Sequence, residues 1–322
     1  MEPELPDELL ARPFAAVREA CAEVAARARF VAIDTERLAA YAREIPRAEL
    51  GRGATVFPAV GRDAETLAAF VLTLDAVNFG SGWFPLLRKR PGLSGYRMVE
   101  TLLRERFERS GPIAAAELRA IDPSAVAELL EQSPVHGPAA ELVELYARAL
   151  RELGEVIQRR AAGSFAGFVE EAGGSGAALV RSLAALPLWR DVSRYDGQLV
   201  PFLKRAQIVV SDLGHALPDD LGRFRDLREL TLFADNLVPH VLRLDGVLRF
   251  DSELVARIER EEVLTHDSPE EVEIRACAVD AVEQLARALD STARDLDDWL
   301  WRRGGEAKYK ARPRHRARCS FY

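Results

Sequence analysis

The sequence has little cysteine and no residue spacing that is typical of a bound metal. Three cysteines occur among 322 residues, Cys21, Cys277 and Cys319, and they lie far apart. They form neither a C-x-x-C pair nor a dense disulfide pattern, which fits a reducing compartment. The five histidines are scattered along the chain. We therefore expect no metal site.

Long apolar segments are also absent. No apolar run approaches the ~20 residues that a membrane-spanning helix needs. The first residues, "MEPELPDELL", are acidic and show no signal-peptide pattern. With 48% hydrophobic and 30% charged residues, the chain can bury a large core. We expect a cytoplasmic protein with no membrane partner, folded as one compact unit over residues 1–322.

Charge is distributed unevenly. The net charge is −7, but residues 302–322 contain eight Lys or Arg side chains and one Glu. The remainder has 36 basic and 50 acidic side chains, a net charge of −14, which argues against binding along a nucleic acid backbone. The basic segment is either a solvated tail or an RNA contact, although its last residues, "CSFY", are mostly apolar and favour docking onto the body of the protein.

Helical patterns dominate, and they predict a mainly α fold with few short strands. A Ser-Pro-x-Glu capping box begins at Ser268 and predicts a long helix to Leu289, on which Glu273 and Asp280 are expected to pair with Arg275 or other buried cations. Gly173–Gly176 lacks the Lys and the preceding strand of a phosphate loop, so it is interpreted as a turn between helices. Other helices are predicted at 9–29, 64–77, 139–160 and 201–212, and short, ambiguous strands at 29–33 and 247–250.

Asp235 is a single carboxylate inside the apolar stretch "ELTLFADNLVPHVL". Pro239 has no N–H, so a helix is easier to begin at 235–236 than to continue through it. Asp235 would then lie at the positive end of a helix, beside Phe233. From residue type alone, a structural cap and a catalytic carboxylate both remain open.

Two further stretches combine polar and apolar side chains. In "VPFLKRAQIVVSDL", Lys204 and Arg205 occupy the first helical turn, where cations are disfavoured unless an anion pairs with them; the alternative is a solvated basic pair. In "TLDAVNFGSGWFP", Asp75 and Asn78 share one helix face and are followed by aromatic residues, which suits a flat heterocycle. A helix end packed by aromatic side chains is the alternative.

These stretches, together with "GSFAGFV", "WRDV", "EVEIRACAVDAVEQL", "DDWLW" and "HRARCSFY", resemble the queuosine salvage proteins, which are queuosine 5′-phosphate N-glycosylases, also called hydrolases. The resemblance covers Thr73–Tyr322. It implies a compact helical fold related to the helix-hairpin-helix DNA glycosylases, with residues 71–322 as the glycosylase core and 1–70 as a helical flank. The glycine-containing hairpin signature is missing here, so neither duplex DNA binding nor a lysine Schiff base is expected.

The resemblance also implies an activity and a site. The activity is hydrolysis of queuosine 5′-monophosphate to queuine and ribose 5-phosphate, without metal or other cofactor. Asp235 is expected to be the stabiliser, the water-activating base or the nucleophile, and Lys204 to bind the ribose or its phosphate, with Arg205. The other expected substrate contacts are Asp75, Asn78, Phe79, Trp83, Asp196 and Phe233, with Asp212 as a spare candidate.

Two other hypotheses compete with the enzyme. One is a binding protein for queuine or its nucleotide that performs no chemistry. The other is a tRNA-contacting helical module that uses the basic segment 302–318, although tRNA contact is not what we expect. Release of free base separates the first alternative from an enzyme.

Overall fold

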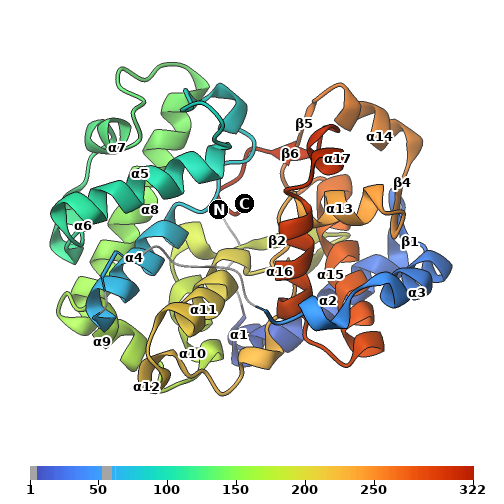
Figure 1. Ribbon diagram of the computed structural model, residues 1–322, viewed down its shortest axis with the longest axis horizontal. Coiled ribbons are helices and arrows are strands. Elements are labelled where there is room, and N and C mark those ends of the chain that lie inside the picture. Colours follow the sequence, from blue (N-terminus) through green and yellow to red (C-terminus); the bar gives the residue numbers. More distant parts are fainter. Residues whose placement is uncertain (1–5, 53–59, 62) are drawn as a thin grey trace.

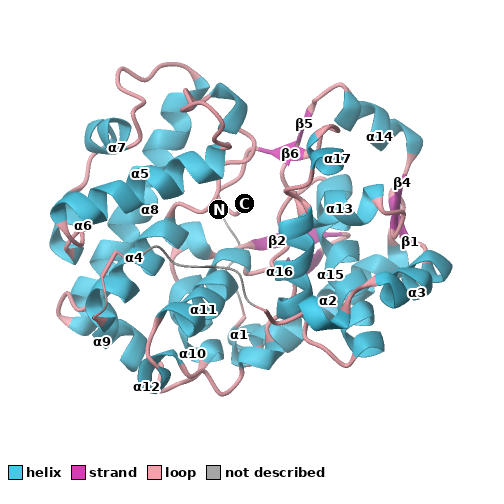
Figure 2. Ribbon diagram, viewed as in Figure 1, coloured by secondary structure: helices cyan, strands magenta, loops and turns pink. Residues whose placement is uncertain are grey.

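The computed structural model describes residues 6–52, 60–61 and 63–322, so the acidic residues 1–5 lie outside it. Helices dominate and strands are short, which confirms the predicted mainly α class (Figure 2). The helices are α1 (Asp7–Ala11), α2 (Pro13–Arg27), α3 (Thr35–Glu44), α4 (Ala64–Ala76), α5 (Gly95–Ser110), α6 (Ala115–Ala120), α7 (Pro123–Leu129), α8 (Pro138–Ala161), α9 (Phe165–Glu170), α10 (Gly176–Ala184), α11 (Lys204–Ala216), α12 (Asp219–Gly222), α13 (Val238–Leu244), α14 (Ser252–Glu259), α15 (Pro269–Leu289), α16 (Ala293–Arg303) and α17 (Ala307–Lys310).

Most helix predictions are confirmed, with two corrections. Helix α15 starts as predicted, because the Ser268 hydroxyl accepts the backbone N–H of Glu271 at 3.4 Å. The predicted helix 9–29 is instead two helices, α1 and α2, which meet at Arg12 and Pro13. The helix expected to open at Pro201 begins at Lys204 and continues to Ala216, because Pro201 ends a strand.

Three two-stranded sheets complete the described structure: β1 (Val31–Ile33) with β4 (Leu248–Phe250), β2 (Val192–Tyr195) with β3 (Gln198–Pro201), and β5 (Val263–Leu264) with β6 (Arg316–Ala317). The first two sheets are antiparallel and the third is parallel. Strands β1 and β4 are the two stretches that were ambiguous in sequence. The β2–β3 hairpin turns at Asp196-Gly197, where both residues have positive φ.

Helix α15 is buried along most of its length and is the main packing surface of one half of the molecule. Helices α2 and α3 pack against it, and α13 and α16 contact it as well (Figure 1). In the other half, α4 packs against α8, α9 and α11. Helices α5 and α16 come from the two halves, and both contribute to the pocket described below.

The C-terminal segment is docked onto the body of the protein, as "CSFY" suggested. Cys319, Phe321 and Tyr322 are buried. The loop after α4 holds this segment through its backbone: the Gly80 N–H donates to the Tyr322 carbonyl at 3.0 Å. A Cβ at Gly82 would lie 2.5 Å from the Ala317 carbonyl oxygen, so this close approach requires glycine. The chain end marked C in Figure 1 accordingly lies between the two groups of helices.

Within the described part of the chain, no helix combines the length and the apolar character that crossing a membrane requires.

Candidate functional site

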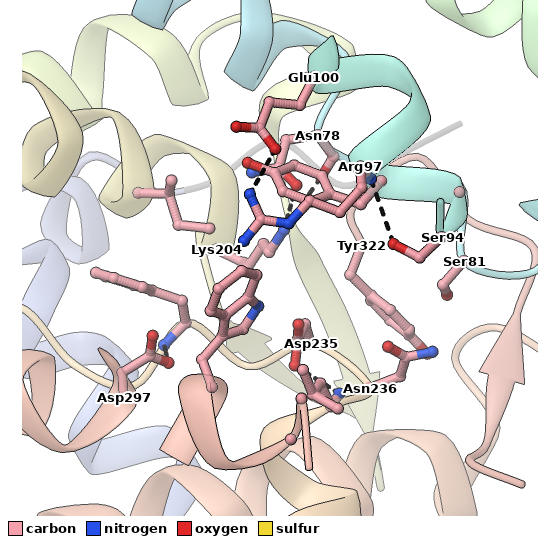
Figure 3. A pocket seen from close by; sticks show the side chains of 18 of the residues that line it. Asn78, Ser81, Ser94, Arg97, Glu100, Lys204, Asp235, Asn236, Asp297 and Tyr322 are labelled. Atoms are coloured by element: carbon pink, nitrogen blue, oxygen red, sulfur yellow. Dashed lines mark hydrogen bonds and ion pairs between the residues drawn. The ribbon is translucent and has the colours of Figure 1, made fainter. Parts of the chain in front are cut away.

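A pocket of about 710 Å³ lies where the two halves of the molecule meet (Figure 3). It combines aromatic and aliphatic walls with converging charged groups, a composition typical of small-molecule sites. Its lining residues include Phe70, Leu74, Asn78, Phe79 and Ser81 from α4 and the following loop; Tyr96, Arg97 and Glu100 from α5; Lys204, Ile208, Ser211 and Asp212 from α11; Phe233, Asp235 and Asn236 from the segment before α13; Asp297 and Trp301 from α16; and Lys310, Arg314 and Tyr322 from the C-terminal segment.

Asp235 caps the start of α13 with one carboxylate oxygen. Its Oδ1 accepts the backbone N–H of Leu237 at 2.7 Å and of Val238 at 3.2 Å. The helix begins at Val238, two to three residues later than predicted, and Pro239 lies in its first turn. Oδ2 makes no hydrogen bond within the described residues, and the side chain lines the pocket. A structural cap and a reactive carboxylate are therefore compatible, because each role uses a different oxygen.

Lys204 reaches the same pocket from the first turn of α11. Its ammonium group donates to the Asn78 carbonyl at 3.1 Å and to Asn78 Oδ1 at 3.4 Å. Burial lowers the pKa of Lys204, whereas the nearby carboxylates of Asp235 and Asp75 raise it. Figure 3 shows Lys204 with Asn78 on one side of the pocket and Asp235 on the other.

A buried ion pair positions both of these side chains. Asp191 Oδ2 accepts the backbone N–H of Lys204 at 3.0 Å and takes the place of a cap, since Leu203 at the helix start has no capping side chain. Arg275 binds the same carboxylate through two hydrogen bonds of 3.0 and 2.7 Å. The Arg275 Nε also donates to the Ala234 carbonyl at 3.0 Å, directly before Asp235. One guanidinium thus links the segments that present Lys204 and Asp235.

Besides Asp235, the pocket contains two carboxyl groups whose pKa values are raised, those of Asp212 and Asp297. Burial raises the pKa of Asp212 on α11, and the charge of Asp75 adds to this effect. Burial also raises the pKa of Asp297 on α16, and the next contribution comes from Asp235. Asp297 Oδ1 accepts the Phe233 N–H at 3.2 Å. Perturbed carboxyl groups in a pocket are typical of acid–base sites.

Comparison with known proteins places the chain in a family. Residues 58–322 match the model of the queuosine salvage protein family. The chain belongs to the queuosine salvage protein family. A Sphaerobacter thermophilus protein named queuosine 5′-phosphate N-glycosylase/hydrolase is 41% identical over 272 residues, which are 80% of this chain and 82% of that protein. A Mus musculus protein of the same name is 31% identical over 197 residues, 56% of this chain and 58% of the relative.

This member of the queuosine salvage family brings five of the predicted site residues to one pocket. They are Asn78, Phe79, Lys204, Phe233 and Asp235. They come from three segments that are distant in sequence, and the spare candidate Asp212 joins them. Their individual roles stay predictions.

Arg205 and Asp196 do not line this pocket, and their assignment as substrate contacts stays a prediction. The buried Arg205 guanidinium lies between the Phe79 and Trp189 rings and donates to carbonyls at the C-terminal end of α4, including that of Ala76 at 2.6 Å. It stabilises that helix end, although its Nε has no hydrogen-bond partner among the described residues. Asp196 lies in the β2–β3 turn and pairs with Arg29 at 3.2 Å.

Trp83 and Asp75 are buried and do not line the pocket either, and their expected contacts with substrate also stay predictions. The Trp83 indole N–H donates to Glu141 at 2.8 Å. Asp75 is buried and accepts from Asn78 Nδ2 at 3.1 Å through Oδ1, while Oδ2 has no hydrogen-bond partner. Asp75 acts on the pocket through Asn78 and by charge.

Several pocket residues were not singled out from the sequence. Asp297 and Trp301 are the first and last residues of the family-like motif "DDWLW", and Tyr322 ends the motif "HRARCSFY", so the signal was present without a role attached. Asn236 directly follows Asp235. Arg314 had no signal beyond the basic composition of its segment.

Among the described residues, His266, Asp267 and Glu271 place potential metal-ligand atoms within 4.8 Å of one another. This group does not line the pocket. Glu271 already lies 3.8 Å from the Arg275 guanidinium and accepts the Asp267 N–H at 3.2 Å. A metal here would compete with an existing ion pair.

The raised pKa of Asp75 predicts an unusual pH dependence of the free energy of unfolding. Burial raises its pKa from 3.8 to about 7, against the opposing effects of Asn78, Lys204 and Arg205. The proton is therefore bound more tightly in the folded state, so the contribution of Asp75 to stability is complete below pH 3.8 and is lost as the pH rises to about 7. The variant Asp75→Asn cannot ionise. Relative to wild type, we expect it to gain up to roughly 4 kcal/mol of unfolding free energy between pH 4 and 7.

Urea denaturation at several pH values measures this difference. The control is Asp63→Asn at the exposed N-cap of α4, because the hydrogen bond from Thr66 lowers the pKa of Asp63. Its effect has the opposite sign: the wild type gains stability relative to this variant as the pH rises. Parallel stability curves for Asp75→Asn and wild type would refute the prediction.

Proposed function

We propose that this protein hydrolyses the N-glycosidic bond of queuosine 5′-phosphate and releases queuine and ribose 5-phosphate. The main support is that a relative with this name is 41% identical and aligned over 82% of its length. The pocket supports the same conclusion. Asp235 presents its Oδ2, which makes no hydrogen bond to the described residues, opposite the buried Lys204.

In the proposed reaction, the bond between C1′ of the ribose and the base nitrogen breaks, and positive charge develops on the sugar. A carboxylate beside C1′ stabilises this charge, as in glycosidases. We assign this role to Asp235. Water supplies the hydroxyl group that C1′ gains. The remaining proton of that water accounts for the proton that the departing base gains.

The leaving base has to be protonated, and its ring needs flat apolar walls. Asp212 and Asp297 are pocket carboxyl groups whose pKa values burial raises, so they are candidates for proton donors. Phe79 and Phe233 are the candidates for packing against the ring, and Asn78 for reading its edge. The hydrogen bond from Lys204 to Asn78 links the proposed base-binding end of the pocket to the proposed sugar-binding end.

A direct assay tests this function. Queuosine 5′-monophosphate is incubated with the protein, and queuine and ribose 5-phosphate are measured separately. We expect both products in equal amounts and none from guanosine 5′-monophosphate, which lacks the queuine side chain. Tight binding without either product would support the non-catalytic alternative instead.

A tRNA-contacting role has less support. Of the eight basic side chains in the segment 302–318, five pair with acidic side chains of the same chain: Arg302, Arg303, Lys308, Arg312 and Arg316. A surface whose positive charge is already neutralised attracts a phosphate backbone weakly.

A further inference from the structure

Arg314 is a cation of the pocket that has no partner in the described structure. It lies in the C-terminal segment between α17 and β6 and is partly buried. No hydrogen bond, ion pair or aromatic ring engages its guanidinium within the described residues, although it lines the pocket. Burial lowers the pKa of Arg314, while the charge of Asp235 raises it. A partly desolvated guanidinium without an acceptor is costly unless a ligand supplies one.

The backbone on both sides of Arg314 is fixed. The Pro313 carbonyl accepts from the Arg243 guanidinium at 3.1 Å, and the His315 carbonyl accepts from Asn236 Nδ2 at 3.1 Å. Asn236 directly follows Asp235, so the contact couples the C-terminal segment to the proposed catalytic carboxylate. Arg314 is thus held beside Asp235 before any ligand arrives, which lowers the entropy lost on binding.

The other basic side chains of the C-terminal segment also favour an anion site at this end of the pocket. Lys310 also lines the pocket, and its ammonium group makes no ion pair or hydrogen bond in the described structure. Arg316 lines it too, but pairs with Glu261 at 3.4 Å. The basic side chains of this segment that lie outside the lining include Arg312, which pairs with Glu259 at 2.8 Å. Positive charge is therefore left unneutralised where the pocket passes the C-terminal segment.

We propose that Arg314, assisted by Lys310, binds the 5′-phosphate of the substrate. This inference rests on the proposed function and assigns the phosphate end of its substrate. Asp235 faces C1′ in that function, and the 5′-phosphate is joined to the same ribose, so a cation held next to Asp235 is within reach of it. A guanidinium matches phosphate oxygens with two parallel hydrogen bonds. Lys204, which the resemblance assigns to the ribose or its phosphate, donates to Asn78 in this structure.

The test compares two substrates, queuosine 5′-monophosphate and the phosphate-free nucleoside queuosine. For Arg314→Ala, we expect kcat/KM on the nucleotide to fall about 10- to 100-fold, mostly through KM, because a charge-assisted contact is lost. On the nucleoside it should change less than about threefold. The variant Arg314→Lys should recover part of the preference for the nucleotide.

Arg318→Ala is the matched control. Arg318 is an exposed arginine of the same segment that makes no ion pair with any residue the structure describes and does not line the pocket, so its loss should leave both substrates unaffected. Equal losses on nucleotide and nucleoside in Arg314→Ala would overturn the inference, as would an unchanged preference. If Arg314→Ala does not fold, Arg314→Gln replaces it.

A binding measurement separates this inference from the proposed function. Ribose 5-phosphate is titrated into wild type, Arg314→Ala and Arg318→Ala and followed by calorimetry. Weaker binding in Arg314→Ala alone supports the phosphate site even if wild type cleaves neither substrate, a result that would refute only the function. Equal affinity in all three proteins overturns the phosphate site, whatever the activity assay shows.

Discussion

Asp235→Asn is expected to lower kcat about a thousandfold while the protein stays folded. A carboxylate ~4 Å from a developing positive charge stabilises it by roughly 4 kcal/mol at an effective dielectric constant of ~20. That energy corresponds to about three orders of magnitude in rate. The amide keeps an oxygen that can accept the N–H groups of Leu237 and Val238. We therefore expect the unfolding free energy to change by less than about 1 kcal/mol.

The matched control is Asp251→Asn. Asp251 caps α14 with the same geometry, since its Oδ1 accepts the N–H groups of Glu253 at 2.9 Å and Leu254 at 3.5 Å, and it does not line the pocket. This variant should release queuine at the wild-type rate. Single-turnover measurement of base release, alongside urea denaturation, distinguishes a chemical defect from an unfolded preparation. A folded Asp235→Asn protein with near wild-type release would exclude the catalytic role.

Local signals in the sequence were enough to place single elements. The Ser268 cap and the turn between helices at 173–176 each depend on residues within a few positions, and both were predicted correctly. The family resemblance added the association of Lys204 with Asp235, which no local pattern gives. The implied relation to helix-hairpin-helix DNA glycosylases stays a prediction.

The sequence could not predict which distant residues pair with one another. From the sequence, Arg205 was either half of a solvated basic pair or a contact for an anion, whereas its guanidinium donates to a helix end about 130 positions earlier. Glu273 was expected to pair with Arg275 or another buried cation; instead its Oε2 accepts three backbone N–H groups, those of residues 29–31, and the partner of Arg275 is Asp191. Helical periodicity shows that such a charge faces inward, but not which charge meets it.

The pair of Arg275 and Asp191 leads to the largest stability effect that we expect. Arg275→Met removes the guanidinium but leaves the Asp191 carboxylate buried. Among the described residues, this carboxylate then keeps the backbone N–H of Lys204 as a hydrogen-bond donor. Removing one member of a buried ion pair typically costs 3–5 kcal/mol, and we expect a loss of about that size in urea denaturation. The control Arg257→Met breaks partly exposed pairs with Glu262 and Glu270 and should cost less than about 1 kcal/mol.

The double variant Arg275→Met/Asp191→Asn tests whether the loss comes from the unpaired charge. Because the Asp191 charge is gone and Glu271 is the carboxylate that still lies near the position of the guanidinium, we expect the double variant to be more stable than Arg275→Met alone, a coupling that a double-mutant cycle measures directly. Its activity should nevertheless stay low, because the Ala234 carbonyl has lost the guanidinium that fixed it, and the side chain at position 191 that accepts the Lys204 N–H is no longer held by Arg275. Recovery of stability without recovery of kcat would show that this buried pair serves to position Lys204 and Asp235. Full recovery of both, or no coupling between the two sites, would contradict that role.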